Sequence, residues 1–174
     1  MPLSFTSPEQ FSWQVRKIAV VGPGIVGMPM AALLAHARIR EGSDQPAKVV
    51  VVQRNSKTSG WKVPAINRGE SVIGGVEPGL DDIVRDAVKE GILSATHRYE
   101  DVADADVILV SVQTDKKGFG PDYGPMMEAL EGLAKRAADR TAFATAVRAL
   151  ELASELSPSP RQRSERAVLA AQLV

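Results

Sequence analysis

The feature that most constrains this chain is a set of three glycines, Gly22, Gly24 and Gly27, spaced as GxGxxG. They follow the apolar run of residues 18–21, which is typical of a strand buried in a parallel sheet. They precede a stretch with helical spacing of apolar residues, and we expect a helix over residues 25–39. A strand, a glycine turn and a helix in this order predict the first unit of a dinucleotide-binding fold.

Each glycine has a separate physical role in such a turn. The first allows a tight turn, the second lets the backbone approach a pyrophosphate, and the third allows close packing of the helix on the strand. The pyrophosphate then lies at the helix N-terminus, where we expect the backbone N–H groups of Ile25 and Val26 to donate hydrogen bonds. No Gly-Lys-Ser/Thr sequence follows, which argues against a Walker-type loop. The alternative is a glycine turn that only packs a helix on a sheet.

Further strands and helices alternate along the chain. Strands are expected at residues 48–53, 93–96 and 106–113, and helices at residues 61–67, 80–90 and 125–136. This alternation predicts an α/β fold, a Rossmann-like parallel sheet with about four recognisable strands. All 14 glycines lie at or before Gly132, and the later residues are rich in alanine, leucine, arginine, serine and glutamate. We therefore predict a dinucleotide-binding domain over residues 1–138 and an alanine-rich, helical or disordered tail over residues 139–174.

The residues after the second expected strand bear on the choice of cofactor. An Asp or Glu is expected there to bind the ribose hydroxyls, but this chain has Gln53, Arg54 and Ser56. Gln53 is able to hydrogen-bond a hydroxyl, whereas Arg54 and Ser56 suit a 2′-phosphate. These residues leave both NAD and NADP open as cofactors, and the alternative is a solvated loop.

Composition and charge narrow the classes of partner. The formal net charge is zero, which argues against a nucleic-acid partner or an anionic membrane surface. The chain has no cysteine and two histidines, so we expect neither a thiol nucleophile nor a typical zinc site. The N-terminus lacks the pattern of a secretory signal, and no apolar run is long enough to span a bilayer. We therefore expect a cytoplasmic protein without a nucleic acid, membrane or metal as partner.

A family resemblance rests on three stretches of the chain. They are GPGIVGMPMA (residues 22–31), KVPAINRGESVIGGVEPGL (residues 62–80) and ADADVILVSVQT (residues 103–114). Over about residues 16–135, the chain resembles the UDP-glucose/GDP-mannose dehydrogenase family of nucleotide-sugar 6-dehydrogenases. The resemblance implies oxidation of the C6 alcohol of a nucleotide sugar to a carboxylate, with two NAD molecules used in turn. It also implies that Lys62 helps to hold the cofactor and that Thr114 contacts it beside the nicotinamide. A solvated lysine and a threonine at a strand end are the alternatives.

The chain departs from the family pattern in two places. Gln113-Thr114-Asp115 stands where the family has Pro-Thr-Pro, and the alanine-rich tail replaces the fifth strand expected after Arg136. The family's nucleophilic cysteine, its helper lysine and asparagine, and its sugar-binding C-terminal domain have no counterpart, so we assign no catalytic residue. We expect the NAD(P)-binding domain of a nucleotide-sugar (UDP-sugar) 6-dehydrogenase, inactive alone as a truncated form.

The alternative function belongs to a different class. A Rossmann-like protein without catalytic activity would use the fold for assembly or regulation. The missing fifth strand leaves a sheet edge exposed, and such an edge invites pairing with another chain. On this hypothesis the protein forms a homo-oligomer through that edge.

Overall fold

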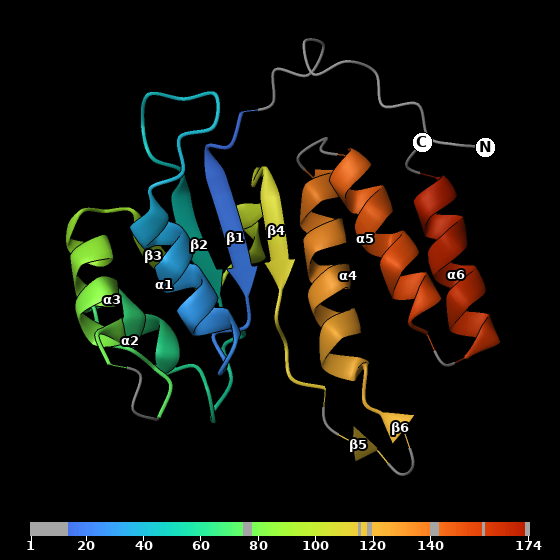
Figure 1. Cartoon of the computed structure of the whole chain (residues 1–174). Coiled ribbons are helices and arrows are strands. Elements are labelled where there is room, and N and C mark those ends of the chain that lie inside the picture. The colour runs from blue at the N-terminus through green and yellow to red at the C-terminus, as the bar shows by residue number, and fades with distance from the viewer. Residues whose placement is uncertain are drawn as a thin grey trace, which may run out of the picture.

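The fold is an α/β structure in which strands and helices alternate before three consecutive helices (Figure 1). The computed structural model describes residues 14–74, 78–114, 116–117, 120–139, 143–157 and 159–172. In chain order the elements are β1 (Lys17–Val21), α1 (Gly27–Ala37), β2 (Lys48–Val52), α2 (Lys62–Asn67), α3 (Leu80–Lys89), β3 (Leu93–Thr96), the 3₁₀ helix η2 (Tyr99–Val102), β4 (Val107–Val110), β5 (Lys116–Lys117), β6 (Gly120–Pro121), α4 (Gly124–Asp139), α5 (Phe143–Glu155) and α6 (Pro160–Ala171).

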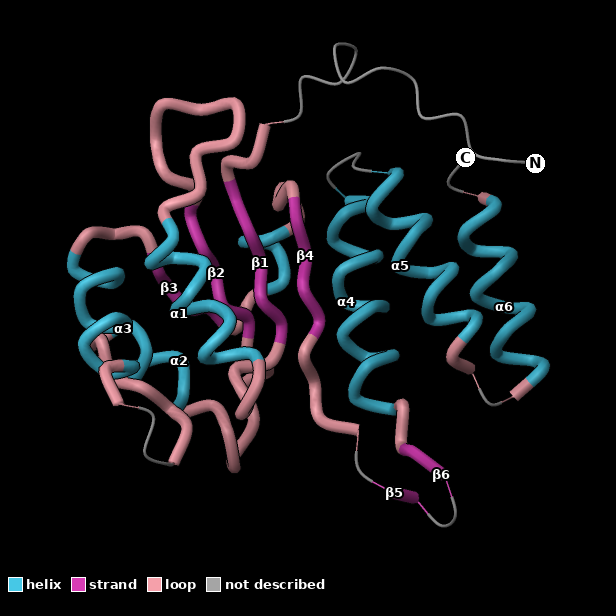
Figure 2. Tube along the Cα trace, viewed as in Figure 1, coloured by secondary structure: helices cyan, strands magenta, loops and turns pink. Residues whose placement is uncertain are grey.

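β1 to β4 form one parallel sheet in the order β3-β2-β1-β4 (Figure 2). β1 lies inside the sheet, where Val20 is aligned with Val51 of β2 and Leu109 of β4. Both faces of a parallel sheet are covered, so its strands carry continuous apolar runs. Residues 18–21 and 49–52 are accordingly buried. The valine-rich sequence of β2 suits this position because β-branched side chains pack well on a pleated surface.

Each face of the sheet has its own cover, because successive strand residues point to opposite faces. On one face, Val20 belongs to an apolar cluster that includes Met28 of α1 and Val84 of α3. On the other face, Val21 belongs to a cluster that includes residues of η2 and Leu133 of α4. The sheet therefore lies between α1, α2 and α3 on one side and η2 and α4 on the other.

The last three helices, α4, α5 and α6, lie side by side beyond β4 (Figure 1). Leu130 and Ala134 of α4 share a small apolar core with Leu150 and Ala153 of α5 and Ala170 of α6. In the described part of the chain, no helix combines the length and the apolar character needed to cross a membrane.

A single arginine links these three helices. The side chain of Arg166 on α6 is 13% exposed and forms an ion pair with Glu131 of α4. Its Nε donates to the Glu131 carboxylate at 2.7 Å, and its Nη1 donates to Ser157 Oγ at 2.6 Å, just after α5. Ser157 Oγ in turn donates to the carbonyl of Ala153 at 2.6 Å. Arg166 therefore joins α6 both to α4 and to the end of α5.

The structure confirms the α/β prediction, with a parallel four-stranded sheet and C-terminal helices. α1 is shorter than the expected helix because Arg38 adopts a left-handed conformation with φ 49° and ends it. β4 ends at Val110, three residues before the expected end, because its neighbour β1 ends at Val21. The β5–β6 hairpin was not predicted. The domain boundary at residue 138 falls in the last turn of α4 and stays a prediction.

Candidate functional site

The glycine turn joins the C-terminal end of β1 to the N-terminus of α1. Gly22 has a left-handed φ of 95°, and its N–H donates to the carbonyl of Val52 at 2.9 Å. The N–H of Gly24 donates back to the Gly22 carbonyl at 2.9 Å, and that of Met28 donates to the Gly24 carbonyl at 3.0 Å. The turn is thus tied to β2 and closed on itself before the helix begins. The first N–H groups of a helix have no intrahelical acceptor, so this end of α1 presents donors.

The three glycines differ in what their missing Cβ atoms would meet. A Cβ on Gly22 would lie 2.4 Å from the carbonyl oxygen of Ser111, and a Cβ on Gly27 would lie 2.0 Å from the carbonyl oxygen of Gly22. A Cβ on Gly24 would have no atom within 4 Å. Packing within the chain therefore explains why Gly22 and Gly27 are glycines, and it does not explain Gly24. Gly24 faces open space, so a phosphate group is able to approach the protein backbone there.

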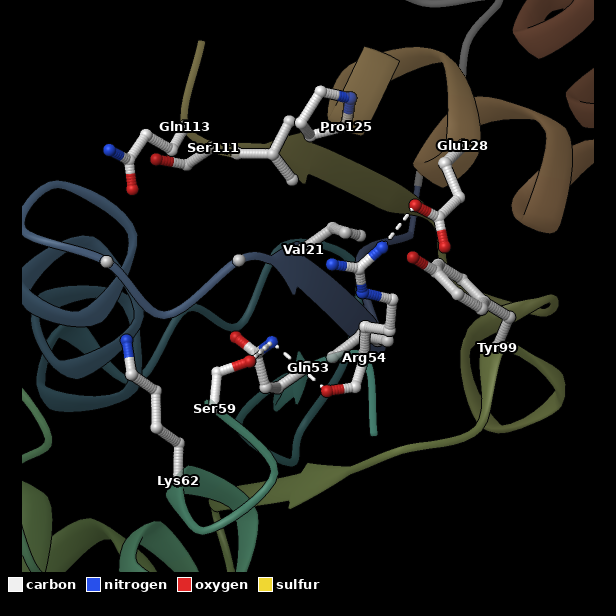
Figure 3. A pocket seen from close by; sticks show the side chains of 14 residues that line it. Val21, Gln53, Arg54, Ser59, Lys62, Tyr99, Ser111, Gln113, Pro125 and Glu128 are labelled. Atoms are coloured by element: carbon white, nitrogen blue, oxygen red, sulfur yellow. Dashed lines mark hydrogen bonds and ion pairs between the residues drawn. The ribbon is translucent and has the colours of Figure 1, made fainter. Parts of the chain in front are cut away.

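That open space is part of a pocket of about 290 Å³ (Figure 3). It lies at the C-terminal ends of the strands, bounded by Val21 of β1, Val52 of β2 and Ser111 just after β4. Ligands of open α/β sheets bind in the crevice outside the carboxyl ends of the strands. Five of the residues expected from the sequence line the pocket, namely Gly22, Gly24, Gln53, Arg54 and Lys62.

Lys62 reaches the glycine turn from the first residue of α2 (Figure 3). Its Nζ donates to the carbonyl of Pro23 at 3.0 Å. An ammonium group has three donors, so this bond leaves further donors at the pocket wall. The contact puts a positive charge beside the turn.

Gln53 follows β2 and is held by the loop after it. Its N–H donates to the carbonyl of Thr96 at 3.0 Å, and its side-chain Nε2 donates to Ser59 Oγ at 3.0 Å. The carbonyl of Gln53 is 2.8 Å from Nδ1 of His97, which fixes the backbone at the end of β2. The amide of Gln53 is therefore oriented at the pocket floor, where the ribose is expected in this fold.

Arg54 points across the pocket toward α4. Its Nη1 is 2.6 Å from the Glu128 carboxylate, and the side chains are 60% and 54% exposed (Figure 3). Tyr99 of η2 lies beside this pair. Burial raises the pKa of the Tyr99 hydroxyl above its usual value, the Glu128 carboxylate raises the same pKa further, and Arg54 opposes both effects. This end of the pocket is thus closed by a cation, an anion and an aromatic ring.

The other expected site residues do not line the pocket. Ile25 and Val26 lie at the turn with side chains 78% and 57% exposed, and Gly27 is buried where α1 begins. The hydroxyl of Ser56 is 2.7 Å from that of Ser59 and accepts the Ser59 N–H at 3.2 Å. Thr114 is exposed in the segment that follows β4.

Sequence reasoning missed several lining residues, of which Ser59, Tyr99, Pro125 and Glu128 are the clearest. Glu128 contacts Arg54 across 74 positions of sequence. No local pattern marks either Tyr99 or Glu128, because each reaches the pocket only through the packing of η2 and α4. Among the described residues, no group of acidic, histidine or cysteine side chains is arranged to hold a metal ion.

Comparison with known proteins identifies the family of this chain. Residues 16–147 match the "UDP-glucose/GDP-mannose dehydrogenase family, NAD binding domain". The chain belongs to this family. The matched residues are the NAD-binding domain of the family, so the dinucleotide of this chain is NAD.

The relatives are longer dehydrogenases, of which this chain matches only a part. The UDP-N-acetyl-D-mannosamine dehydrogenase of Campylobacter jejuni is 34% identical over 122 residues, which are 70% of this chain and 25% of that protein. The enzyme of the same name from Salmonella typhi is 36% identical over 118 residues, 68% of this chain and 23% of that protein. The crystal structure of NDP-N-acetyl-D-galactosaminuronic acid dehydrogenase from Methanosarcina mazei Go1 superimposes with a TM-score of 0.62 at 33% identity, covering 71% of this chain and 25% of that one. The chain thus spans about a quarter of the length of these relatives.

Proposed function

We propose that this chain binds NAD in the pocket at the ends of β1, β2 and β4, as the cofactor-binding part of a UDP-sugar 6-dehydrogenase. The proposal rests mainly on the open space at Gly24. Its missing Cβ leaves open space in the pocket, whereas the missing Cβ atoms of Gly22 and Gly27 are explained by contacts within the chain. The substrate class follows from relatives named for UDP-N-acetyl-D-mannosamine and UDP-glucose.

The residues of the pocket suit the parts of the cofactor in turn. The pyrophosphate is expected at the N-terminus of α1, where the backbone N–H groups of Ile25 and Val26 donate and the helix dipole favours negative charge. Lys62 adds a positive charge beside the same turn. The amide of Gln53, held by Ser59, faces the ribose hydroxyls. When bound, NAD supplies the acceptor for a hydride taken from an alcohol carbon.

We further propose that the 174-residue polypeptide gives no turnover on its own. Positioning of the reacting carbon against the nicotinamide supplies much of the rate, of order 7–11 kcal/mol in favourable cases. The sequence also has no cysteine, so the thiol that the family resemblance implies for the second oxidation is absent from these residues.

Titration of the purified chain with NADH by calorimetry tests the binding proposal. Gly24→Val places a side chain in the open space, so we expect it to weaken NADH binding about tenfold or more. Gly74→Val is the matched control, because a Cβ on Gly74 also meets no atom within 4 Å and Gly74 does not line the pocket. Absence of saturable binding by the folded wild-type chain at millimolar NADH would refute the proposal. Equal loss of affinity in both variants would show that the glycine turn is not the binding site.

Turnover is tested with the same preparations. The chain is incubated with NAD and a panel of UDP- and GDP-sugars while absorbance at 340 nm reports reduced cofactor. No increase is expected. Turnover that disappears in Gly24→Val would show that these residues contain a catalytic arrangement, and turnover that persists in it would indicate a contaminating enzyme.

Assembly without catalysis is the second candidate function. The observation that favours it is the position of β4 at the end of the sheet, where among the described strands it pairs with β1 alone. The outer edge of such a strand is able to pair with another chain. Sedimentation velocity discriminates the two candidates. A dimer without affinity for NADH favours assembly, whereas a monomer that binds NADH excludes it.

A further inference from the structure

The pair formed by Arg54 and Glu128 bears on which dinucleotide the pocket accepts. We propose that Glu128 sets the choice of cofactor: it neutralises Arg54, so that the site takes the free 2′-hydroxyl of NAD and rejects the 2′-phosphate of NADP. The inference rests on the proposed NAD-binding function and assigns its selectivity to a residue of α4.

The position of Arg54 by itself favours NADP. It is the second residue after β2, where this fold meets the adenosine ribose, and an arginine there accommodates a 2′-phosphate. The usual Asp or Glu that excludes the phosphate is replaced by Gln53, which carries no charge. Without a further anion, the end of β2 would therefore present an unopposed cation to the ribose.

The structure supplies that anion from another element. The Glu128 carboxylate lies 2.6 Å from Arg54 Nη1, and both residues line the pocket. The second group that suits a phosphate, the hydroxyl of Ser56, is already bonded to Ser59, and Ser56 does not line the pocket. The two groups that the sequence suggests for a 2′-phosphate, the Arg54 guanidinium and the Ser56 hydroxyl, are thus both bonded to other side chains of the protein.

The electrostatic consequence follows from the charges around the pocket. Among the described residues, three charged side chains line it: Arg54, Glu128 and Lys62. Lys62 is directed to the glycine turn, where it donates to the Pro23 carbonyl. A phosphate monoester carries about −1.5 to −2 charges at neutral pH, so at Arg54 it would meet the Glu128 carboxylate at short range. The neutral ribose hydroxyl of NAD meets no such repulsion.

The same pair contributes little to the stability of the fold. Its side chains are 60% and 54% exposed, and an ion pair with this exposure is worth little in solvent. Substitution of either partner therefore changes the local charge without removing a core contact. Glu128 and Arg54 are accordingly accessible to mutation as tests of selectivity.

The experiment measures Kd for NADH and for NADPH by calorimetry and compares their ratio. Wild type is expected to bind NADH more tightly. Glu128→Gln frees Arg54, so we expect the ratio of the NADPH Kd to the NADH Kd to fall about tenfold or more. Arg54→Gln leaves Glu128 unopposed and is expected to raise the same ratio. Arg54→Gln combined with Glu128→Gln is expected to lose the gain in NADPH affinity, because the cation that binds the phosphate is gone.

Glu131→Gln is the matched control. It removes the same charge from the same helix, and Glu131 pairs with Arg166 outside the NAD pocket. The ratio of the two Kd values is expected to match wild type. Circular dichroism establishes that each variant is folded. Since Glu128→Gln and Arg54→Gln move the ratio in opposite directions, either variant alone keeps the inference testable.

The outcomes separate this inference from the function on which it rests. If folded wild type binds neither dinucleotide, the proposed function fails. If it binds NADH and the ratio in Glu128→Gln equals that of wild type, the function stands and the role of Glu128 is refuted. Preference of wild type for NADPH refutes the inference as well, because Glu128 would then fail to exclude the phosphate.

Discussion

Substitution of Gly27 by alanine separates the structural glycines of the turn from the one that faces the pocket. An added Cβ would lie 2.0 Å from the carbonyl oxygen of Gly22 and 3.2 Å from the Cβ of Ser111. The first of these atoms is backbone, tied to β2 through the Gly22 N–H, so it has little freedom to move. The start of α1 is equally constrained, because Gly27 and Met28 are buried against the sheet.

The magnitude follows from the severity of this overlap. Overpacking costs typically 1–3 kcal/mol, and contact with a fixed carbonyl oxygen puts Gly27→Ala at about 3 kcal/mol, the upper end. For a chain of this size, 1 kcal/mol lowers Tm by roughly 2–4 °C, so we expect a fall of roughly 6–12 °C. Thermal unfolding followed by circular dichroism measures it. Gly24→Ala is the control and is expected within about 2 °C of wild type, because its Cβ meets no atom within 4 Å. A Tm for Gly27→Ala equal to that of Gly24→Ala would refute the assignment of separate roles.

Three further predictions concern single side chains. Lys62→Met keeps the stem and removes the ammonium at the Pro23 carbonyl, so NADH affinity is expected to fall about tenfold while Tm stays close to wild type; unchanged affinity in calorimetry would contradict a role for Lys62 at the cofactor. Burial raises the pKa of Tyr99, so the folded state keeps this proton at pH values above about 10 where the unfolded chain has lost it, and stability falls as pH rises through that window. The fall in Tm between about pH 9 and 11 should therefore be smaller in Tyr99→Phe than in wild type, and an identical fall would contradict this effect. Arg166→Met removes the hydrogen bond from the guanidinium to the buried Ser157 hydroxyl as well as the pair with Glu131, so we expect a loss of about 1 kcal/mol in thermal unfolding with NADH affinity unchanged; a change in affinity would show that the tail acts on the pocket.

Much of the sheet is predictable from local pattern, for a physical reason. Strands buried on both faces need continuous apolar runs, and residues 18–21 and 49–52 have them. The ends of elements are set by neighbours instead. β4 leaves the sheet after Val110 because β1 ends at Val21, although the expected strand extends to residue 113. The end of α1 depends on Arg38 in a left-handed conformation, which arginine does not signal.

The residues of the pocket also fall into those that the sequence predicts and those that it does not. The glycine turn and Lys62 are predictable because their roles belong to a contiguous motif and to a family resemblance. Glu128 is not predictable, because its contact with Arg54 depends on how α4 packs beside the sheet. The sequence alone therefore suggests that Arg54 is available for a 2′-phosphate, whereas in the structure Arg54 is paired with Glu128. The charge around Arg54 depends on which helices pack beside it, whereas the glycine turn depends only on residues that are neighbours in the sequence.

α4 is the element that connects the pocket to the rest of the molecule. One side of it packs on the sheet through Ala129 and Leu133, and another packs on α5 and α6 through Leu130 and Ala134. Glu128 immediately precedes these residues and faces Arg54. The lining residues of the pocket come from β1 through α4 and none from the described parts of α5 or α6. Among the described helices, α4 alone contributes side chains both to the pocket and to the apolar core that it shares with α5 and α6.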